Sequence, residues 1–367
     1  MEHKVSILRC NRIILVLGLC VLVIVSIIAY TRFDLFSPAA RTIVKKIRPA
    51  IDIINQSFNR KYDNSSRLAE NLVEKTTNTS VPVSRKFTIE THKVTGASKK
   101  QGKEFGYLKP NDHFVVPNIA HFVWFSCRTF KFENLISMLS AHRIMKADKV
   151  YFHTNCEPSG EWWIQAKTLI PTLTVVNRTS PTKVFNKTLS TKYIEHHADV
   201  ARIQILLEMG GVYFDPDVFV LAPLEPLRYY EFVIGKEAIK FFNNGVLIAS
   251  NSSKFLKVYY ENYKNYKSSC WGCTSIRDIN GLASKHVNFL HIEPHSMIQP
   301  NPLDWRLLFF EKYKWEEEHF TIHVWFRYYR TRAPKPMEFN PENIKQLNTT
   351  IGEMCRYIYY GSPAIIV

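Results

Sequence analysis

From residue 110 onward, short apolar runs alternate with stretches in which apolar residues recur at helical spacing, a pattern typical of a layered α/β fold. The expected strands are NIAHFVWFS, KVYFHT, TLTVVN, VYF, EFVIG, NGVLIAS, NFLHIE and FTIHVWF. The expected helices are FENLISMLSAHRIM, EWWIQAKTLI, Thr191–Met209 and KFLKVYYENYKNYK. This alternation predicts a largely parallel sheet, and ligands of such sheets bind at the carboxyl ends of the strands.

The N-terminus has a different pattern. Residues 13–30 form an uncharged, almost wholly apolar run, and Lys4, Arg9 and Arg12 precede it. Such a run is just long enough to cross a bilayer, and its basic flank favours a cytosolic N-terminus. We expect a cytosolic tail at 1–12 followed by a transmembrane signal anchor. A cleaved signal peptide is the competing interpretation, disfavoured because no small-residue cleavage site follows immediately.

Residues 31–109 are rich in Lys, Arg, Asn, Ser and Thr and show little periodicity, which predicts a luminal stem without a core of its own. The remainder, 110–367, is expected to be one folded domain. Beyond the apolar run lie seven N-x-S/T sequons, in agreement with passage through the secretory pathway. They are Asn55, Asn64, Asn78, Asn177, Asn186, Asn251 and Asn348.

A formal net charge of +16 permits a nucleic acid, an anionic membrane or a phosphorylated substrate as partner. No recognition helix, zinc finger or aromatic RNA-binding signature is present, so we expect no nucleic-acid partner. Five of the seven cysteines follow the apolar run, and an odd number leaves one without an intramolecular disulfide partner in an oxidising compartment. CWGC at residues 270–273 lacks the second pair of ligands that a zinc site needs.

The stretch GGVYFDPDVFVL carries the strongest chemical signal. Asp215 and Asp217 follow an apolar strand, with Pro216 stiffening the turn between them. Buried carboxylates need a positive partner, and no Lys or Arg lies within the stretch. Oxygen ligands favour a hard dication, Mn²⁺ or Mg²⁺, over zinc. A solvated turn is the alternative, since D-x-D triplets are common on surfaces.

Upstream of the two glycines, Asp199 and Arg202 lie three residues apart and therefore on one face of the expected helix. Two interpretations remain open. The pair forms an ordinary surface ion pair that contributes little stability, or both side chains project toward the pocket of the two aspartates.

The segment HADVARIQILLEMGGVYFDPDVFVLAPL resembles the D-x-x-R…G-G-x-Y-x-D-x-D segment of glycosyltransferases that carry the DXD sugar-binding motif. This group includes α-1,4-galactosyl- and α-1,4-N-acetylglucosaminyltransferases and Och1-type mannosyltransferases. IAHFVWFS, NNGVLIAS and IHVWF occur in the expected order, so the resemblance extends over residues 110–367. Anchor, stem and luminal domain are similar in layout to single-pass type II Golgi membrane transferases.

The resemblance implies a GT-A-type, Rossmann-like domain that transfers a hexose from a nucleotide-diphosphate sugar, with retention of anomeric configuration. Galactose or N-acetylglucosamine from a UDP-sugar is the expected donor group, and a glycolipid or glycoprotein glycan is the expected acceptor. Three residues are implied to hold Mn²⁺ or Mg²⁺: Asp215, Asp217 and His323. Three are implied to contact the transferred sugar: Asp199, Arg202 and Asn244. Three are implied to bind the nucleotide: Trp124, Tyr213 and Trp325.

The chain also departs from the family. Relatives of the α-1,4 type carry W-G-x-T-G-P where this chain has WGCTSI, and Phe326 replaces a frequent Asn after HVW. These differences leave the donor and the acceptor open.

Two other classes of protein remain as alternatives. Aspartyl-phosphate phosphatases also use D-x-D at a strand end, but they need a hydroxyl residue after the second Asp, and Val218 stands there. A catalytically inactive, lectin-like membrane protein that binds nucleotide sugars is the other alternative.

Overall fold

The structure is a computed structural model that describes residues 110–238 and 241–366. The chain divides into two compact units, Met1–Ser98 and Lys99–Val367, and all described residues belong to the second. The cytosolic tail, the anchor and nearly all of the stem that the sequence predicts lie outside the described residues. Among the residues described, no helix is both long and apolar enough to cross a membrane.

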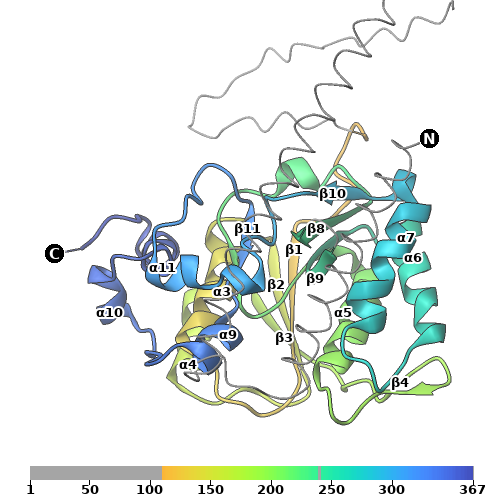
Figure 1. Ribbon diagram of the computed structural model, residues 1–367, viewed down its shortest axis with the longest axis horizontal. Helices are drawn as coiled ribbons and strands as arrows, with labels where there is room; N and C mark the ends of the chain where they lie inside the picture. Colours follow the sequence, from red (N-terminus) through yellow and green to blue (C-terminus); the bar gives the residue numbers. More distant parts are fainter. Residues whose placement is uncertain (1–109, 239–240, 367) are drawn as a thin grey trace, which may run out of the picture. The chain divides into compact units, whose positions relative to one another are not determined.

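A seven-stranded sheet forms the centre of the second unit (Figure 1). Its spatial order is β10-β8-β9-β6-β1-β2-β3. The strands are β1 (Ile119–Trp124), β2 (Lys149–Thr154), β3 (Leu173–Asn177), β6 (Gly211–Phe214), β8 (Phe232–Ala238), β9 (Phe241–Ala249) and β10 (His291–Glu293). Strand β1 pairs in parallel with β2 and β6, β2 with β3, and β10 with β8, whereas β9 runs antiparallel to β6 and β8. The expected α/β fold with a mostly parallel sheet is therefore confirmed.

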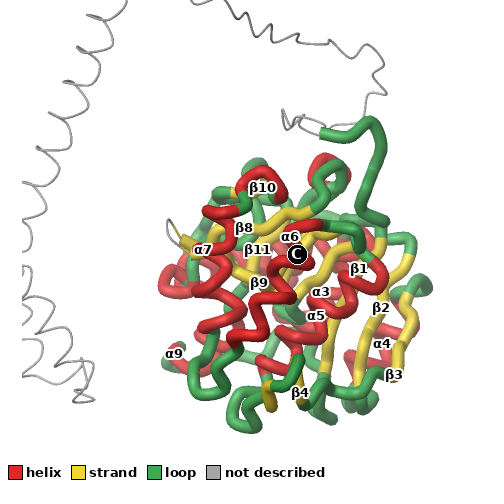
Figure 2. Tube along the Cα trace, turned by 90° about the vertical axis from the view of Figure 1, so that its right-hand side faces the viewer, coloured by secondary structure: helices red, strands yellow, loops and turns green. Residues whose placement is uncertain are grey.

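Helices cover both faces of the sheet (Figures 1 and 2). One face carries α5 (Glu195–Met209), α6 (Lys254–Glu261) and α7 (Asp278–Lys285). The other carries α3 (Phe132–Arg143), α4 (Glu161–Leu169), α8 (Arg306–Phe310), α9 (Phe326–Arg332), α10 (Pro341–Gln346) and α11 (Thr350–Tyr360). Each layer buries its own apolar cluster against the sheet, and this burial is the main stabilising contribution.

Two short two-stranded sheets lie outside the central sheet. Strand β7 (Val218–Val220) pairs antiparallel with β11 (Thr321–His323), and β4 (Lys183–Val184) pairs with β5 (Lys187–Thr188). The first pair matters for the site, because it joins two segments that lie about a hundred residues apart in the sequence. All residues of β7 and of β11 are buried.

Element boundaries differ from expectation in two places that shape the site. KFLKVYYENYKNYK is not one helix, because α6 ends at Glu261 and a 3₁₀ turn, Asn262–Asn265, follows. FTIHVWF is not one strand, because Trp325 adopts a left-handed backbone conformation, with φ of 62°, and a helix begins at Phe326. Both changes redirect aromatic side chains into the interior.

Candidate functional site

Two glycines place the aspartate pair at the carboxyl end of β6. Gly210 and Gly211 have φ angles of 67° and 104°, which only glycine adopts without strain, and they reverse the chain from α5 into the strand. A Cβ on Gly211 would lie 2.6 Å from Ile119 Cγ1 of the neighbouring strand. The Asp215 amide donates to the Gly245 carbonyl at 2.7 Å, and the Val218 amide donates to the Asp215 carbonyl at 3.0 Å. The result is a tight, fixed turn that carries both carboxylates.

The β7–β11 pair delivers the histidine to this turn. His323 lies opposite Val218 in the antiparallel register, and the Val324 amide donates to the Asp217 carbonyl at 2.9 Å. His323 Nε2 consequently lies 3.0 Å from Asp217 Oδ1. One ligand atom from each of Asp215, Asp217 and His323 falls within 4.8 Å of the others.

These three residues fit a divalent cation. Two carboxylate oxygens and one imidazole nitrogen are donors that Mn²⁺ accepts. Gly245 of β9 contributes by lacking a side chain, because a Cβ there would lie 3.0 Å from both Asp215 Oδ2 and His323 Cε1. No local sequence pattern marks this glycine, although it stands directly after Asn244 in NNGVLIAS.

The electrostatics of His323 point the same way. Burial acts to lower the pKa of His323, but the charge of Asp217 and its hydrogen bond outweigh burial and leave the pKa raised above its ordinary value. The two acids therefore favour a positive charge at this position. A dication binding at these atoms would supply that charge.

A buried network connects the acids to helix α5. Arg202 NH2 lies 3.2 Å from both Asp199 Oδ1 and Asp215 Oδ1, and its NH1 donates to the Asn244 carbonyl at 2.6 Å. Asn244 Nδ2 in turn donates to Asp199 Oδ1 at 2.9 Å. Arg202 is only 4% exposed, so its pairing with Asp199 is not a surface ion pair. From this buried position Arg202 holds both Asp199 and Asp215 in place.

Tyr213 belongs to the same network. Its hydroxyl donates to Asp215 Oδ1 at 2.7 Å, and the Arg202 guanidinium lies 4.4 Å from the centre of its ring. Burial is the main reason that the pKa of Tyr213 lies well above its ordinary value, so the phenol keeps its proton and remains a donor to Asp215. Its predicted place near the nucleoside stays a prediction.

The two tryptophans have different surroundings. The ring of Trp325 stacks on His323 with 3.7 Å between centroids, and its Nε1 donates to the Pro300 carbonyl at 2.8 Å. Trp124, at the carboxyl end of β1, packs against Phe130 and Phe152 and is 5% exposed. Eight of the nine predicted residues thus form one connected set, and Trp124 has no described contact with it.

Comparison with known proteins matches part of this arrangement to a family. Residues 126–234 match the family described as a glycosyltransferase sugar-binding region containing the DXD motif. This part of the chain is such a region. It spans α3 to β8 and includes Asp199, Arg202, Tyr213 and both aspartates. The resemblance to DXD glycosyltransferases is thereby confirmed at the level of the family.

Relatives match over part of their length. The chain is 26% identical over 190 residues to glucan organizing enzyme 1 of Cryptococcus neoformans var. grubii, over 47% of this chain and 50% of that protein. It is 29% identical over 146 residues to an uncharacterized protein of Arabidopsis thaliana, over 36% and 23% of the two chains. The chain thus spans half or less of these curated relatives. Among solved structures, a galactosyltransferase, LgtC, in complex with donor and acceptor sugar analogs matches with 10% identity and a TM-score of 0.30, covering 68% of this chain and 97% of that one.

Proposed function

We propose that this protein is a metal-dependent glycosyltransferase of the GT-A type that moves a hexose from a nucleotide-diphosphate sugar to a glycan. The observation that carries the proposal is the cluster of Asp215, Asp217 and His323 at the carboxyl end of β6, within one chain that also contains a DXD sugar-binding region. Ligands of α/β sheets bind at this end of the strands.

The chemistry follows from charge. A sugar leaves a nucleotide diphosphate only when the negative charge that develops on the diphosphate is stabilised. A dication held by the three residues would supply that stabilisation as a Lewis acid. Tyr213 and Arg202 hold Asp215 in one orientation, so little reorganisation is needed when the diphosphate arrives.

The network around α5 faces the transferred sugar in this proposal. Next to the acid pair, Asp199 offers a carboxylate that accepts hydrogen bonds and Asn244 offers an amide. Arg202 holds these two residues together. Trp325, which stacks on His323, lies beside the phosphates of the donor. Trp124 and Tyr213 contact its nucleoside. Transfer proceeds with retention, and the metal is Mn²⁺ or Mg²⁺.

The donor is a UDP-sugar that carries galactose or N-acetylglucosamine, and the acceptor is a glycolipid or a glycoprotein glycan. The N-terminal apolar run anchors the protein as a single-pass type II protein of the Golgi membrane, with the catalytic unit in the lumen. The sequons beyond the run and the polar stretch that follows it support this location.

The aspartyl-phosphate alternative is weaker. Val218 is completely buried and forms part of the β7–β11 pair, so no hydroxyl stands where a phosphatase of that type needs one. Asp217, the second acid, is already held by His323.

A donor panel tests the proposal. The purified full-length protein is incubated in detergent with UDP-galactose, UDP-N-acetylglucosamine, UDP-glucose and GDP-mannose, with Mn²⁺ or with EDTA. We expect nucleotide release with one donor, which EDTA abolishes and Mn²⁺ restores. Binding of a donor without turnover would favour the lectin-like protein instead, and turnover that EDTA leaves unchanged would contradict the metal-dependent mechanism.

A further inference from the structure

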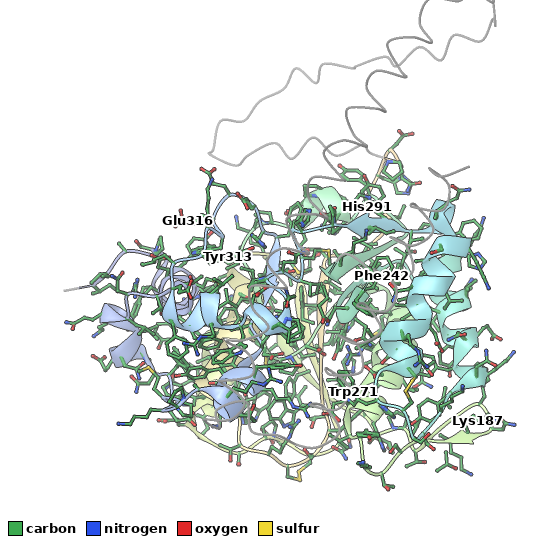
Figure 3. The ribbon with its side chains drawn as sticks, in the orientation of Figure 1. Lys187, Phe242, Trp271, His291, Tyr313 and Glu316 are labelled. Atoms are coloured by element: carbon green, nitrogen blue, oxygen red, sulfur yellow. A yellow bond between two sulfur atoms is a disulfide. The ribbon has the colours of Figure 1, made fainter. Side chains whose placement is uncertain are left out.

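A small pocket lies next to the acid cluster, between α5, the 3₁₀ turn after α6, and a π-helical turn at Cys273–Arg277. Its lining residues are His196, Asp199, Tyr263, Tyr266, Cys270, Gly272, Cys273, Thr274 and Ser275. The pocket is partly open to solvent and leaves room for about one water-sized group. Trp271, labelled in Figure 3, precedes Gly272 and is 52% exposed. Because Asp199 lines the pocket and also pairs with Arg202, the pocket adjoins the site already described.

Three polar atoms of the lining make no well-aligned hydrogen bond to the described residues. The Tyr263 side chain is 1% exposed, and its hydroxyl lies close to that of Tyr259 without meeting the geometry of a hydrogen bond. The neighbouring Tyr259 hydroxyl donates its own proton to the Ser275 carbonyl at 2.7 Å. Asp199 uses Oδ1 for Asn244 and Arg202, which leaves Oδ2 for another donor. The Thr274 hydroxyl likewise makes no hydrogen bond within the part of the chain described. Of the three, the Tyr263 hydroxyl is the buried one, and a buried polar group is rarely left in this state unless a ligand or water completes it.

The rest of the lining is fixed. The Tyr266 hydroxyl accepts from the Ser190 amide at 3.0 Å and lies 2.6 Å from His196 Nδ1. A disulfide joins Cys270 to Cys273 across the rim, so these cysteines hold the loop and do not bind zinc. A rigid lining with unused donors and acceptors is suited to selecting a ligand group by its hydrogen bonds.

We infer that this pocket receives one hydroxyl group of the transferred sugar and that Tyr263 is a specificity-determining residue. The inference rests on the proposed function and deepens it. A sugar hydroxyl both donates and accepts, so it can donate to Asp199 Oδ2 while it accepts from the Tyr263 hydroxyl. An anion could accept from the Tyr263 hydroxyl but could not donate to Asp199 Oδ2.

The size of the pocket adds a second criterion. An acetamido group is several times larger than a hydroxyl and would extend from the pocket into its open mouth. The pocket therefore favours a sugar that carries a free hydroxyl at the recognised position over one that is N-acetylated there. It also rejects a deoxy sugar, because the buried groups would then stay unpaired.

The inference is tested with Tyr263→Phe and a matched control, Tyr260→Phe. Tyr260 is also close to the end of α6, and its hydroxyl accepts from Gln204 Nε2 at 3.0 Å, outside the pocket. The full-length variants are assayed with the active nucleotide sugar and with its monodeoxy analogues, one for each hydroxyl. For the parent sugar, Tyr263→Phe should lower kcat/KM by roughly tenfold, the scale of one hydrogen bond. With one analogue only, the same variant should equal the wild type, because that analogue has already lost the hydroxyl.

A structural role would produce another pattern. If Tyr263→Phe lowers kcat/KM equally for the parent sugar and every analogue, or does not lower it at all, the inference is overturned. Thr274 also lines the pocket, so its hydroxyl is expected to contact the same sugar hydroxyl. Thr274→Val therefore provides a second variant should Tyr263→Phe fail to fold. With the analogue that lacks the recognised hydroxyl, Thr274→Val should equal the wild type; the same result with a different analogue or with none would also overturn the inference. Tyr260→Phe should match the wild type throughout. Wild-type protein that turns over no nucleotide sugar would instead refute the proposed function itself, and the inference with it.

Discussion

Gly245 shapes the proposed metal site without being one of its ligands. It lies in β9, beside the turn that carries Asp215, and its carbonyl holds the Asp215 amide. Any side chain here would enter the space between Asp215 and His323. Sequence patterns do not reveal such a role, because a glycine within a strand can equally mark a bulge or a close backbone approach.

Substituting Gly245→Ala should weaken Mn²⁺ binding by at least about tenfold, since the added Cβ would lie 3.0 Å from Asp215 Oδ2 and 2.8 Å from Asn243 Oδ1. Isothermal titration of Mn²⁺ into the full-length protein measures the effect. Gly281→Ala is the matched control: it lies in α7, where an added Cβ meets nothing within 4 Å, so it should leave metal affinity unchanged. Equal affinity in both variants would argue against the proposed cation position.

At the scale of elements, a chain of buried side chains supports the turn between α5 and β6. Arg178 Nε donates to His153 Nδ1 at 3.3 Å, His153 Nε2 lies 3.1 Å from His121 Nδ1, and His121 Nε2 lies 2.9 Å from the Gly210 carbonyl. Because the arginine can only donate, the order of donors is fixed, and both imidazoles are neutral. The series of contacts ends at Gly210, the residue directly before β6, and β6 leads to the two acids.

The two buried histidines should make the stability of the protein sensitive to acid. Burial is the main cause that lowers the pKa of His121 to about 4 and that of His153 to about 3. In the unfolded chain both imidazoles take up protons near their ordinary pKa of about 6.5. The unfolded state therefore binds more protons than the folded state below that pH, and the free energy of unfolding falls as pH drops from about 6.5 to about 4, by at most about 1.4 kcal/mol per pH unit for each histidine.

Urea unfolding between pH 7.5 and 4.5 measures this slope. His153→Gln removes one of the two imidazoles, so its slope should be shallower than that of the wild type. The exposed His113 provides the control, and His113→Gln should keep the wild-type slope. A slope that His153→Gln leaves unchanged would show that the buried chain does not set the acid response.

The disulfide between Cys127 and Cys156 joins the loops that follow β1 and β2. Its sequence separation of 29 means that opening it frees a loop of about 30 residues in the unfolded chain. The paired substitution Cys127→Ser with Cys156→Ser should lower the free energy of unfolding by about 3 kcal/mol. Chemical denaturation checks this value, and a change well below 1 kcal/mol would mean that the bond constrains little. Cys355 is buried and free, in keeping with the odd number of cysteines beyond the apolar run.

For the molecule as a whole, the sequence predicted the sheet and the acid pair but not how distant segments meet. Local sequence patterns were sufficient to predict β1, β2 and α5, because the spacing of apolar residues follows the secondary structure directly. The meeting of His323 with Asp217 depends on the pairing of β7 with β11, and the resemblance to a family, not a local pattern, suggested it. The pocket beside Asp199 depends on α6 ending at Glu261, within KFLKVYYENYKNYK, and such boundaries are the part that propensity determines least.

Electron–nuclear double resonance on Mn²⁺ tests most directly whether the paired acids hold the cation that contacts the leaving diphosphate. The full-length protein is loaded with Mn²⁺ and UDP and compared with Asp217→Asn. We predict a phosphorus hyperfine coupling to protein-bound Mn²⁺ in the wild type and its loss in the variant. A coupling that persists unchanged in Asp217→Asn, or protein-bound Mn²⁺ without phosphorus coupling while UDP is bound, would contradict the account.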